Sequence, residues 1–198
     1  MAVRTLPRRP TRRREGPPVY SVGICAPGGG LRAAAVGLGT LQVLRATGWI
    51  RSDGYLCYVD EHVGVAAALR QECRTAVVVD VGEGPPALPR GIEVDDVSGL
   101  APGTGLPDDA TGPFRTRLAD AAVVAGWITY PSGRRGRLVL AMPRLTADVP
   151  DAVLRYAATH PAFPHETTAL DDGQVEIYRQ LGRHLGAHVV GTLLRLRT

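Results

Sequence analysis

Three consecutive glycines, Gly28, Gly29 and Gly30, form the segment of the chain best suited to chemistry. They separate a short apolar run from a stretch with helical spacing. Consecutive glycines let backbone N–H groups turn toward one point, and the start of a helix attracts negative charge. We therefore expect a loop that receives a developing oxyanion or a phosphate, with Arg32 adding a full positive charge one turn into the helix.

The glycine run differs from the two common nucleotide-binding loops. It does not follow the pattern Gly-x-x-x-x-Gly-Lys-Ser/Thr, and the chain contains no lysine. It also lacks the spacing Gly-x-Gly-x-x-Gly with an acidic residue after the next strand. The sequence therefore predicts an anion-binding loop that is neither a P-loop nor a dinucleotide-binding loop, and we expect no cofactor.

A second group of reactive residue types, Cys57, Asp60, Glu61 and His62, lies across an expected junction between a strand and a helix. Cys57 and His62 would suit nucleophilic catalysis if their side chains met. Side chains alternate along a strand, so the spacing alone does not give these two a common direction. We favour a buried thiol beside a capping turn and assign no catalytic residue.

Two histidines, His184 and His188, are four residues apart on an expected helix, which is the spacing of a zinc-binding pair. No glutamate follows His184, and no third ligand is evident from the sequence. We therefore favour ordinary helix-surface histidines and predict no metal site. Asp80 ends an expected strand, where sites of α/β proteins often lie. A functional carboxylate and an edge or capping carboxylate are both open interpretations of Asp80.

The glycine run is positioned by an expected alternation of strands and helices in the first part of the chain. Apolar runs predict the strands, and apolar residues at a spacing of three to four predict the helices. Gly48 is expected to end the first helix from the C′ position. This order is typical of α/β proteins with a parallel sheet. The strands are expected at 19–25, 55–59 and 75–81, and the helices at 31–47 and 63–73.

The second part of the chain has a different pattern. Residues 82–113 are rich in glycine, proline and aspartate and predict a long loop. Two apolar runs then flank a turn-forming segment and predict a β-hairpin. A short helix follows with Pro150 in its first turn, and a long last helix has Asp171 or Asp172 as its N-cap. The hairpin strands are expected at 123–130 and 137–142, and the helices at 150–158 and from 172 to about 196.

Charge divides the chain of 198 residues into a basic tail and a nearly neutral body. The formal net charge of +4 comes from 23 arginines and 19 acidic residues, and residues 1–18 hold six of those arginines and one acid. We expect residues 1–18 to be a disordered tail and 19–198 to form one domain. A neutral body does not suit nucleic-acid binding. No apolar stretch is long enough to span a membrane, and three cysteines do not build a disulfide scaffold. We expect a cytoplasmic protein, either free or at the periphery of a membrane.

The glycine run and the helix after it resemble the patatin-like phospholipases, in particular large bacterial members whose first strand starts Gly-Ile-Cys. Here Gly-Gly-Gly-Leu-Arg at 28–32 is followed by Leu-Gly-Thr-Leu-Gln-Val-Leu at 38–44. Residues 61–80 are similar to the family's segment after its catalytic aspartate. Residues 130–185, which include Phe-Pro-His-Glu-Thr-Thr at 163–168, are similar to its C-terminal part. The resemblance covers about two thirds of the chain.

This resemblance implies a Ser–Asp dyad that hydrolyses lipid acyl esters, with the serine in a Gly-x-Ser-x-Gly elbow and the oxyanion hole in the triple glycine. The sequence departs from the family at both catalytic positions. It contains no Asp-Gly-Gly or Asp-Gly-Ala motif, and none of its serines lies in such an elbow. The simplest explanation is an internal loss that joins the flanking blocks near residues 59–61. The serines are Ser21, Ser52, Ser98 and Ser132.

We therefore interpret the chain as a contracted patatin-like domain of the α/β class. The resemblance implies a three-layer arrangement with a short parallel sheet, a β-hairpin and a long C-terminal helix. We expect a catalytically inactive relative that binds a lipid or membrane surface, an anion, or a homologous hydrolase. The alternative is a residual lipid acyl hydrolase that does not use serine. His165 and Glu166 match the family's block, but no role is assigned to them.

Overall fold

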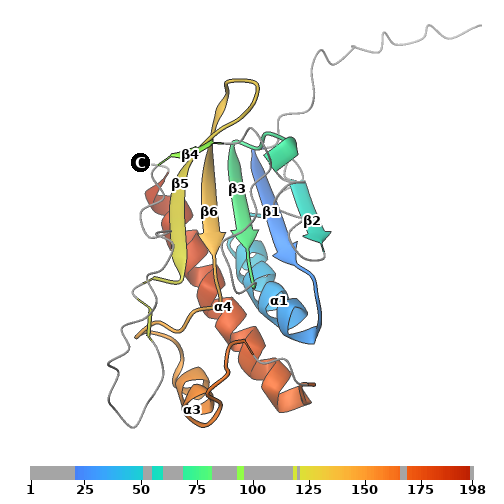
Figure 1. Cartoon of the computed structure of the whole chain (residues 1–198), viewed down its shortest axis with the longest axis vertical. Helices are drawn as coiled ribbons and strands as arrows, with labels where there is room; N and C mark the ends of the chain where they lie inside the picture. The colour runs from blue at the N-terminus through green and yellow to red at the C-terminus, as the bar shows by residue number, and fades with distance from the viewer. Residues whose placement is uncertain are drawn as a thin grey trace, which may run out of the picture.

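The computed structural model describes residues 21–50, 55–59, 69–81, 93–95, 118–119, 121–165 and 169–196. These residues include strands that form one sheet in the order β2-β1-β3-β6-β5-β4, which establishes a mixed α/β fold (Figure 1). The strands are β1 (Val22–Pro27), β2 (Tyr55–Val59), β3 (Thr75–Val79), β4 (Glu93–Asp95), β5 (Val123–Thr129) and β6 (Arg135–Ala141).

In the parallel part of the sheet, β1 lies between β2 and β3. β1 pairs in parallel with β2 on one side and with β3 on the other, and Cys25 lies beside both Cys57 and Val78. All six residues of β1 are buried, as expected for a parallel strand with both faces covered. The prediction of parallel strands in this part of the chain is confirmed.

The predicted β-hairpin is confirmed and extends the same sheet. β5 and β6 pair antiparallel around the turn at 130–134, where Gly133 has a φ of 79°. β6 also pairs in parallel with β3, so that Val77 lies beside Val139. This contact makes the sheet mixed, whereas the sequence indicated only a parallel sheet and a hairpin.

Two long helices cover one face of the sheet, α1 (Leu31–Ala46) and α4 (Asp172–Arg195), while α3 (Asp151–Thr159) lies beyond the end of β6 (Figure 1). Gly48 ends α1 as predicted. Its N–H donates to the carbonyl of Arg45, and the N–H of Trp49 donates to the carbonyl of Leu44, which is the Schellman motif. Asp171 is the N-cap of α4, where it forms a capping box with Gln174.

Glycines bring α1 and α4 into close contact. A Cβ atom on Gly39 would overlap the backbone of α4, and one on Gly182 would overlap the backbone of α1. The buried hydroxyl of Thr40 lies 2.9 Å from the carbonyl oxygen of Gly182 and 3.0 Å from that of Val36. The two helices therefore pack backbone to backbone on the sheet.

The core has two clusters, one on each face of the sheet. The larger one joins β1, β3 and β6 to α1, α3 and α4. The smaller one, on the opposite face, includes Cys25, Val78, Leu138 and the buried Leu69. A three-layer arrangement needs helices on that second face, and the described residues include only a helix end there, at 69 and 70. The described part therefore establishes two layers.

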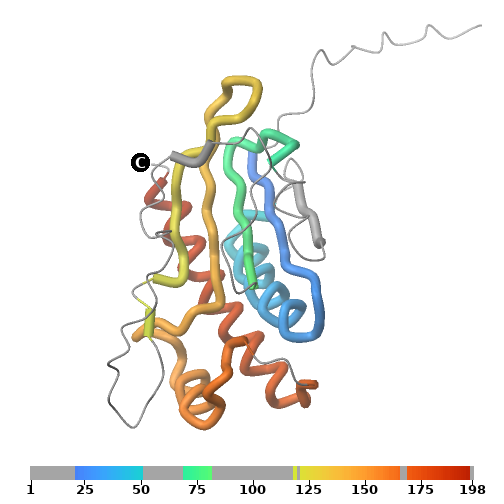
Figure 2. Tube along the Cα trace, viewed as in Figure 1, coloured from blue at the N-terminus to red at the C-terminus, as the bar shows by residue number. Residues whose placement is uncertain are grey.

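Figure 2 follows the described chain from β1 in blue to α4 in red, and it shows β1 and β3 side by side although α1 and β2 lie between them in sequence. Among the described residues, no helix has the length and apolar character that a membrane span requires.

Most boundaries differ from the sequence predictions by a few residues, as for β1, which was expected at 19–25, and two differences are larger. β4 (Glu93–Asp95) lies within the stretch 82–113 that was expected to be a loop, and it pairs with β5. A strand of three residues is too short to show a periodic pattern in the sequence. The helix expected at 63–73 ends at residue 70, before Glu72, which has a φ of 47°. Several predicted segments lie outside the described residues: the tail at 1–18, residues 63–68 and most of the loop at 82–113.

Candidate functional site

The glycine turn leads directly from β1 into α1. Gly28 is buried, whereas Gly29 and Gly30 are exposed. Gly29 has a φ of 93°, and Gly30 has a φ of 120° and a ψ of 178°, a combination that essentially only glycine adopts. Gly30 is the N-cap of α1, and among the described residues no side chain caps this helix. The first turn of α1 also contains no acidic residue, so its N–H groups face no negative side chain of their own helix.

The turn lies at the point where the direction of the sheet's connections reverses. The chain leaves β1 through α1 toward β2 on one side, and it later returns to β3 on the other side (Figure 1). In open α/β sheets, ligands bind outside the carboxyl ends of the strands at such a switch point. The predicted loop therefore occupies the position where this fold class builds binding sites.

Arg32 lies at the same edge of the sheet as the turn. Its Nη2 atom donates a hydrogen bond of 3.4 Å to the carbonyl oxygen of Val81, just beyond the carboxyl end of β3. The structure thus brings the four predicted anion-site residues to one edge. Gly28, Gly29 and Gly30 come from the turn and Arg32 from the first turn of α1.

The other residues singled out from the sequence are placed as follows. Asp80 follows β3 at the carboxyl edge, and its N–H donates to the carbonyl of Ala141 at 2.9 Å. Cys57 is in β2, whereas Asp60, Glu61 and His62 lie outside the described residues. His165 lies in the turn after α3, and Glu166 is outside the described part.

The two described serines lie at the opposite ends of the strands from the glycine turn. Ser21 precedes β1, and its carbonyl accepts a hydrogen bond from Thr75 at the start of β3. Ser132 is in the hairpin turn, where its Oγ donates to a carboxylate oxygen of Glu72 at 2.7 Å. The described part of the chain therefore places no serine beside the glycine turn. Ser52 and Ser98 lie outside it.

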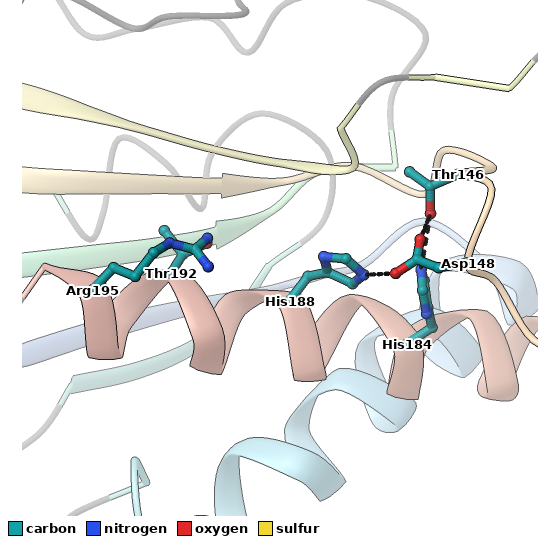
Figure 3. Close-up of polar contacts among 6 residues, drawn as sticks. All are labelled: Thr146, Asp148, His184, His188, Thr192 and Arg195. Atoms are coloured by element: carbon teal, nitrogen blue, oxygen red, sulfur yellow. Dashed lines mark hydrogen bonds and ion pairs between the residues drawn. The ribbon is translucent and has the colours of Figure 1, made fainter.

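A second constellation joins α4 to the loop between β6 and α3. Asp148 in this loop lies beside His184 and His188, and one potential ligand atom from each residue lies within 4.8 Å of the other two (Figure 3). His188 Nε2 is 2.9 Å from Asp148 Oδ2, and His184 Nε2 is 3.7 Å from Asp148 Oδ1. The hydroxyl of Thr146 donates to Asp148 Oδ1 at 2.7 Å and lies 3.0 Å from His184 Nε2. We call Asp148, His184 and His188 the His–Asp cluster.

Local electrostatics favour the neutral histidine and the ionised carboxylate in this cluster. Burial, followed by the neighbouring His188, lowers the pKa of His184 below its ordinary value of 6.5. The hydrogen bond from Thr146, followed by the nearby histidines, lowers the pKa of Asp148 below its ordinary value of 3.8. At neutral pH, His184 is therefore a neutral imidazole and Asp148 carries a negative charge.

The third member of this cluster was missed at the level of sequence. The spacing of His184 and His188 indicated a possible pair, but Asp148 precedes His188 by 40 residues and no local pattern connects them. Packing of the loop after β6 against α4 creates the contact.

Comparison of the chain with protein-family models, with curated proteins and with solved structures gives no match. The chemistry available to the chain is therefore inferred from its own residues. The glycine turn can receive an anion through backbone N–H groups. The His–Asp cluster combines two imidazoles with one carboxylate.

Proposed function

We propose that this chain is a contracted relative of the patatin-like acyl hydrolases that binds an anionic group at the turn between β1 and α1 and does not hydrolyse esters through a serine. One observation carries the proposal. Gly30 adopts a conformation reserved for glycine and exposes a helix start that no described side chain caps, at the carboxyl ends of β1 and β3.

The electrostatics of the turn support an anion as its ligand. The start of a helix carries the equivalent of about half a positive charge, and the first turn of α1 has no carboxylate to neutralise it. Arg32 adds a positive charge at the same end of the sheet, where Asp80 also lies. Because the turn is exposed, salt screens the attraction, and binding is weak and sensitive to ionic strength. A phosphate group at a lipid surface has the required charge and accessibility.

The placement of possible nucleophiles supports a binding role. Both described serines lie at the far edge of the sheet. Cys25 is 3% exposed within β1, so its thiol is not presented to a substrate. Among the described residues, no serine lies beside the turn, and an oxyanion-receiving turn of this kind still binds anions but forms no acyl intermediate.

The direct test is a titration of the ¹⁵N-labelled full chain with inorganic phosphate and with a short-chain phosphatidic acid, followed by amide chemical shifts. We expect the largest shifts at residues 28–33 and a loss of binding at high salt. The amides that begin α4 are an internal control, because Asp171 already caps them. Shifts with phosphatidic acid alone would identify a lipid as the source of the phosphate.

Substitution of Arg32 tests its contribution to this site. Arg32→Gln should weaken phosphate binding several-fold, whereas Arg45→Gln, which removes the same charge in the last turn of α1, should leave it unchanged. Shifts spread evenly over the surface, or equal affinity for the Arg32→Gln variant and the original chain, would show that the turn is only structural.

Fluorophosphonate labelling tests the second half of the proposal. Such probes react with serines activated for nucleophilic attack, so we expect no labelled serine after the intact chain is digested and analysed by mass spectrometry. Stoichiometric labelling of any of the four serines would contradict the proposal. Hydrolysis of a phospholipid without labelling would instead favour a hydrolase that does not use serine.

A further inference from the structure

We propose that Asp148, His184 and His188 form a binding site for a divalent transition-metal ion of the zinc type. The site lies where the loop after β6 packs on α4 (Figure 3). It is independent of the proposed anion site, because it shares no residue with the glycine turn.

The distances within the His–Asp cluster suit a common metal ion. Zinc bonds to imidazole nitrogen and carboxylate oxygen are about 2.0–2.2 Å long, so neighbouring ligand atoms in a tetrahedral site are about 3.3–3.5 Å apart. The two histidine–carboxylate separations are 2.9 Å and 3.7 Å, on either side of this value. All three ligand atoms lie within 4.8 Å of one another, so side-chain rotations that bring the two imidazole nitrogens to the same spacing would place the three atoms around one ion.

The donor set selects the class of metal. Imidazole nitrogen suits zinc, copper, nickel and iron, whereas magnesium and calcium prefer sites built from oxygen. Two nitrogens and one carboxylate oxygen also match the three-ligand sets of catalytic zinc centres, which keep a fourth position open. A zinc-type ion is the ligand that this combination recognises.

Both supports of the site are held by packing. The loop is anchored by Leu145, Thr146 and Val149, each 4% exposed. The helix α4 is anchored by Leu185 and Val189, which are fully buried in the larger core cluster. The ligands therefore come from two elements whose relative position the core determines, which limits the reorganisation needed for binding.

Thr146 orients the carboxylate from the second layer of the site. Its hydroxyl donates to Asp148 Oδ1, and partners of this kind orient metal ligands and raise affinity. Because that proton points to Asp148, the Thr146 oxygen accepts from Nε2–H of His184. A metal ion would bind Nε2 of the other neutral tautomer, in which the ring proton is on Nδ1, and would replace this contact, while the hydrogen bond from Thr146 to Asp148 is kept.

The cluster is open to solvent on one side. The Asp148 and His188 side chains are 62% and 36% exposed, whereas that of His184 is 9% exposed. An ion can reach the site without unfolding of the loop, and water can occupy a remaining coordination position. This accessibility is typical of an exchangeable site with an open position and differs from a closed structural centre.

The experiment uses the full chain without a polyhistidine tag, after treatment with a chelator and dialysis. Zn²⁺ is titrated by calorimetry, and Co²⁺ is added separately because its visible spectrum reports coordination. We expect one ion per chain, a Co²⁺ spectrum without the intense near-ultraviolet band of thiolate ligands, and a higher melting temperature with Zn²⁺.

Variants assign the ion to the cluster. Asp148→Asn and His188→Gln change exposed side chains, so both variants should fold, and each should weaken Zn²⁺ binding at least about tenfold. Thr146→Val removes the orienting hydroxyl and should weaken binding by about 10–100-fold. His160→Gln is the matched control: this histidine stacks on Tyr156 outside the cluster, and its loss should leave the affinity unchanged.

Three results would overturn the proposal. One is the absence of saturable binding of one Zn²⁺ per chain. The second is equal affinity for the original chain, Asp148→Asn and His188→Gln, which would mean an adventitious ion only. The third is a thiolate band with Co²⁺, which would place the ion at a cysteine.

Discussion

Gly30 and Tyr130 are single residues that determine the local structure at opposite ends of the strands. Gly30 turns the chain from β1 into α1 with a φ of 120°. Tyr130 lies at the other edge, where its hydroxyl donates to the carbonyl of Cys73 at 2.7 Å. One residue contributes through its backbone conformation and the other through a buried polar group, so substitutions at the two positions have different physical consequences.

Gly30→Ala should destabilise the chain by about 1–3 kcal/mol, because alanine does not readily adopt this backbone conformation. Steric overlap is not the cause, since a Cβ at this position would meet no atom within 4 Å. Chemical denaturation monitored by circular dichroism measures the loss. Leu31→Ala at the neighbouring exposed position should change stability by less than about 0.5 kcal/mol. Equal stability of the Gly30→Ala variant and the original chain would show that this turn does not require glycine at position 30.

Tyr130 should make the stability of the chain sensitive to alkaline pH. Burial, followed by the charges of Cys73 and Glu72, raises the pKa of Tyr130 well above its ordinary value of 10.0. Above about pH 10 the unfolded chain releases this proton and the folded chain keeps it, so the unfolded state gains. The contribution is fully present below pH 10 and is lost progressively above it.

The measurement compares melting temperatures from about pH 8 to about pH 11 for the original chain and Tyr130→Phe. The variant should lose about 1–3 kcal/mol at neutral pH, because the carbonyl of Cys73 is left without this donor. It should also show a shallower decline above pH 10. The chain has no lysine, so no lysine titration obscures the comparison. Parallel curves would contradict the assigned role of Tyr130.

At the scale of elements, the pair α1–α4 organises the helical face of the sheet. Gly39 and Gly182 allow the two backbones to meet, and Thr40 bridges them with its hydroxyl. α4 also places His184 and His188 beside the loop after β6. The position of α4 against α1 therefore determines where the histidines lie relative to Asp148.

Gly182→Ala should destabilise the chain by about 2 kcal/mol net. The added Cβ would overlap the backbone of Val36, and such overpacking costs more than the roughly 1 kcal/mol that alanine gains in helix propensity. Gly191→Ala in the same helix is the control, because its Cβ would meet only the Arg195 side chain at 3.7 Å. It should gain up to about 1 kcal/mol. Thermal unfolding distinguishes the opposite signs, and stabilisation by both substitutions would show that the helices can move apart without cost.

At the scale of the whole molecule, one mixed sheet connects the two halves of the chain. The parallel pairing of β3 with β6 attaches the hairpin to the first three strands. Both faces of the sheet contain buried apolar clusters, so the fold is stabilised from residues 22 onward by long-range contacts. The arginine-rich sequence of residues 1–18 contains few apolar side chains.

Removal of residues 1–18 should leave the melting temperature unchanged within error, because the segment has almost no apolar surface whose burial would offset its ordering entropy. The formal net charge should fall from +4 to −1, since six arginines and one acid are removed. Differential scanning calorimetry and isoelectric focusing measure both effects. A decrease of several degrees would mean that this segment docks on the domain.

Much of the local structure follows from the sequence, since it depends on residues close together in the chain. The extent of α1 follows from its spacing and from Gly48, and the start of α4 follows from Asp171. The hairpin follows from two apolar runs around a turn. The glycine turn belongs to the same class, because a strand, three glycines and a helix start are contiguous. Backbone sterics and nearby hydrogen bonds decide such features, and a short stretch of sequence contains both.

Tertiary structure alone decided the contacts between distant segments. Three such contacts join residues far apart in the chain. They are the pairing of β3 with β6, the hydrogen bond from Arg32 to the carbonyl of Val81, and the approach of Asp148 to His184 and His188. These contacts depend on how side chains fill the core and on how closely α1 and α4 approach. No periodicity or spacing encodes that packing. The sequence therefore indicated the glycine turn and the histidine pair, and the packed fold brought the carboxylate of Asp148 to that pair.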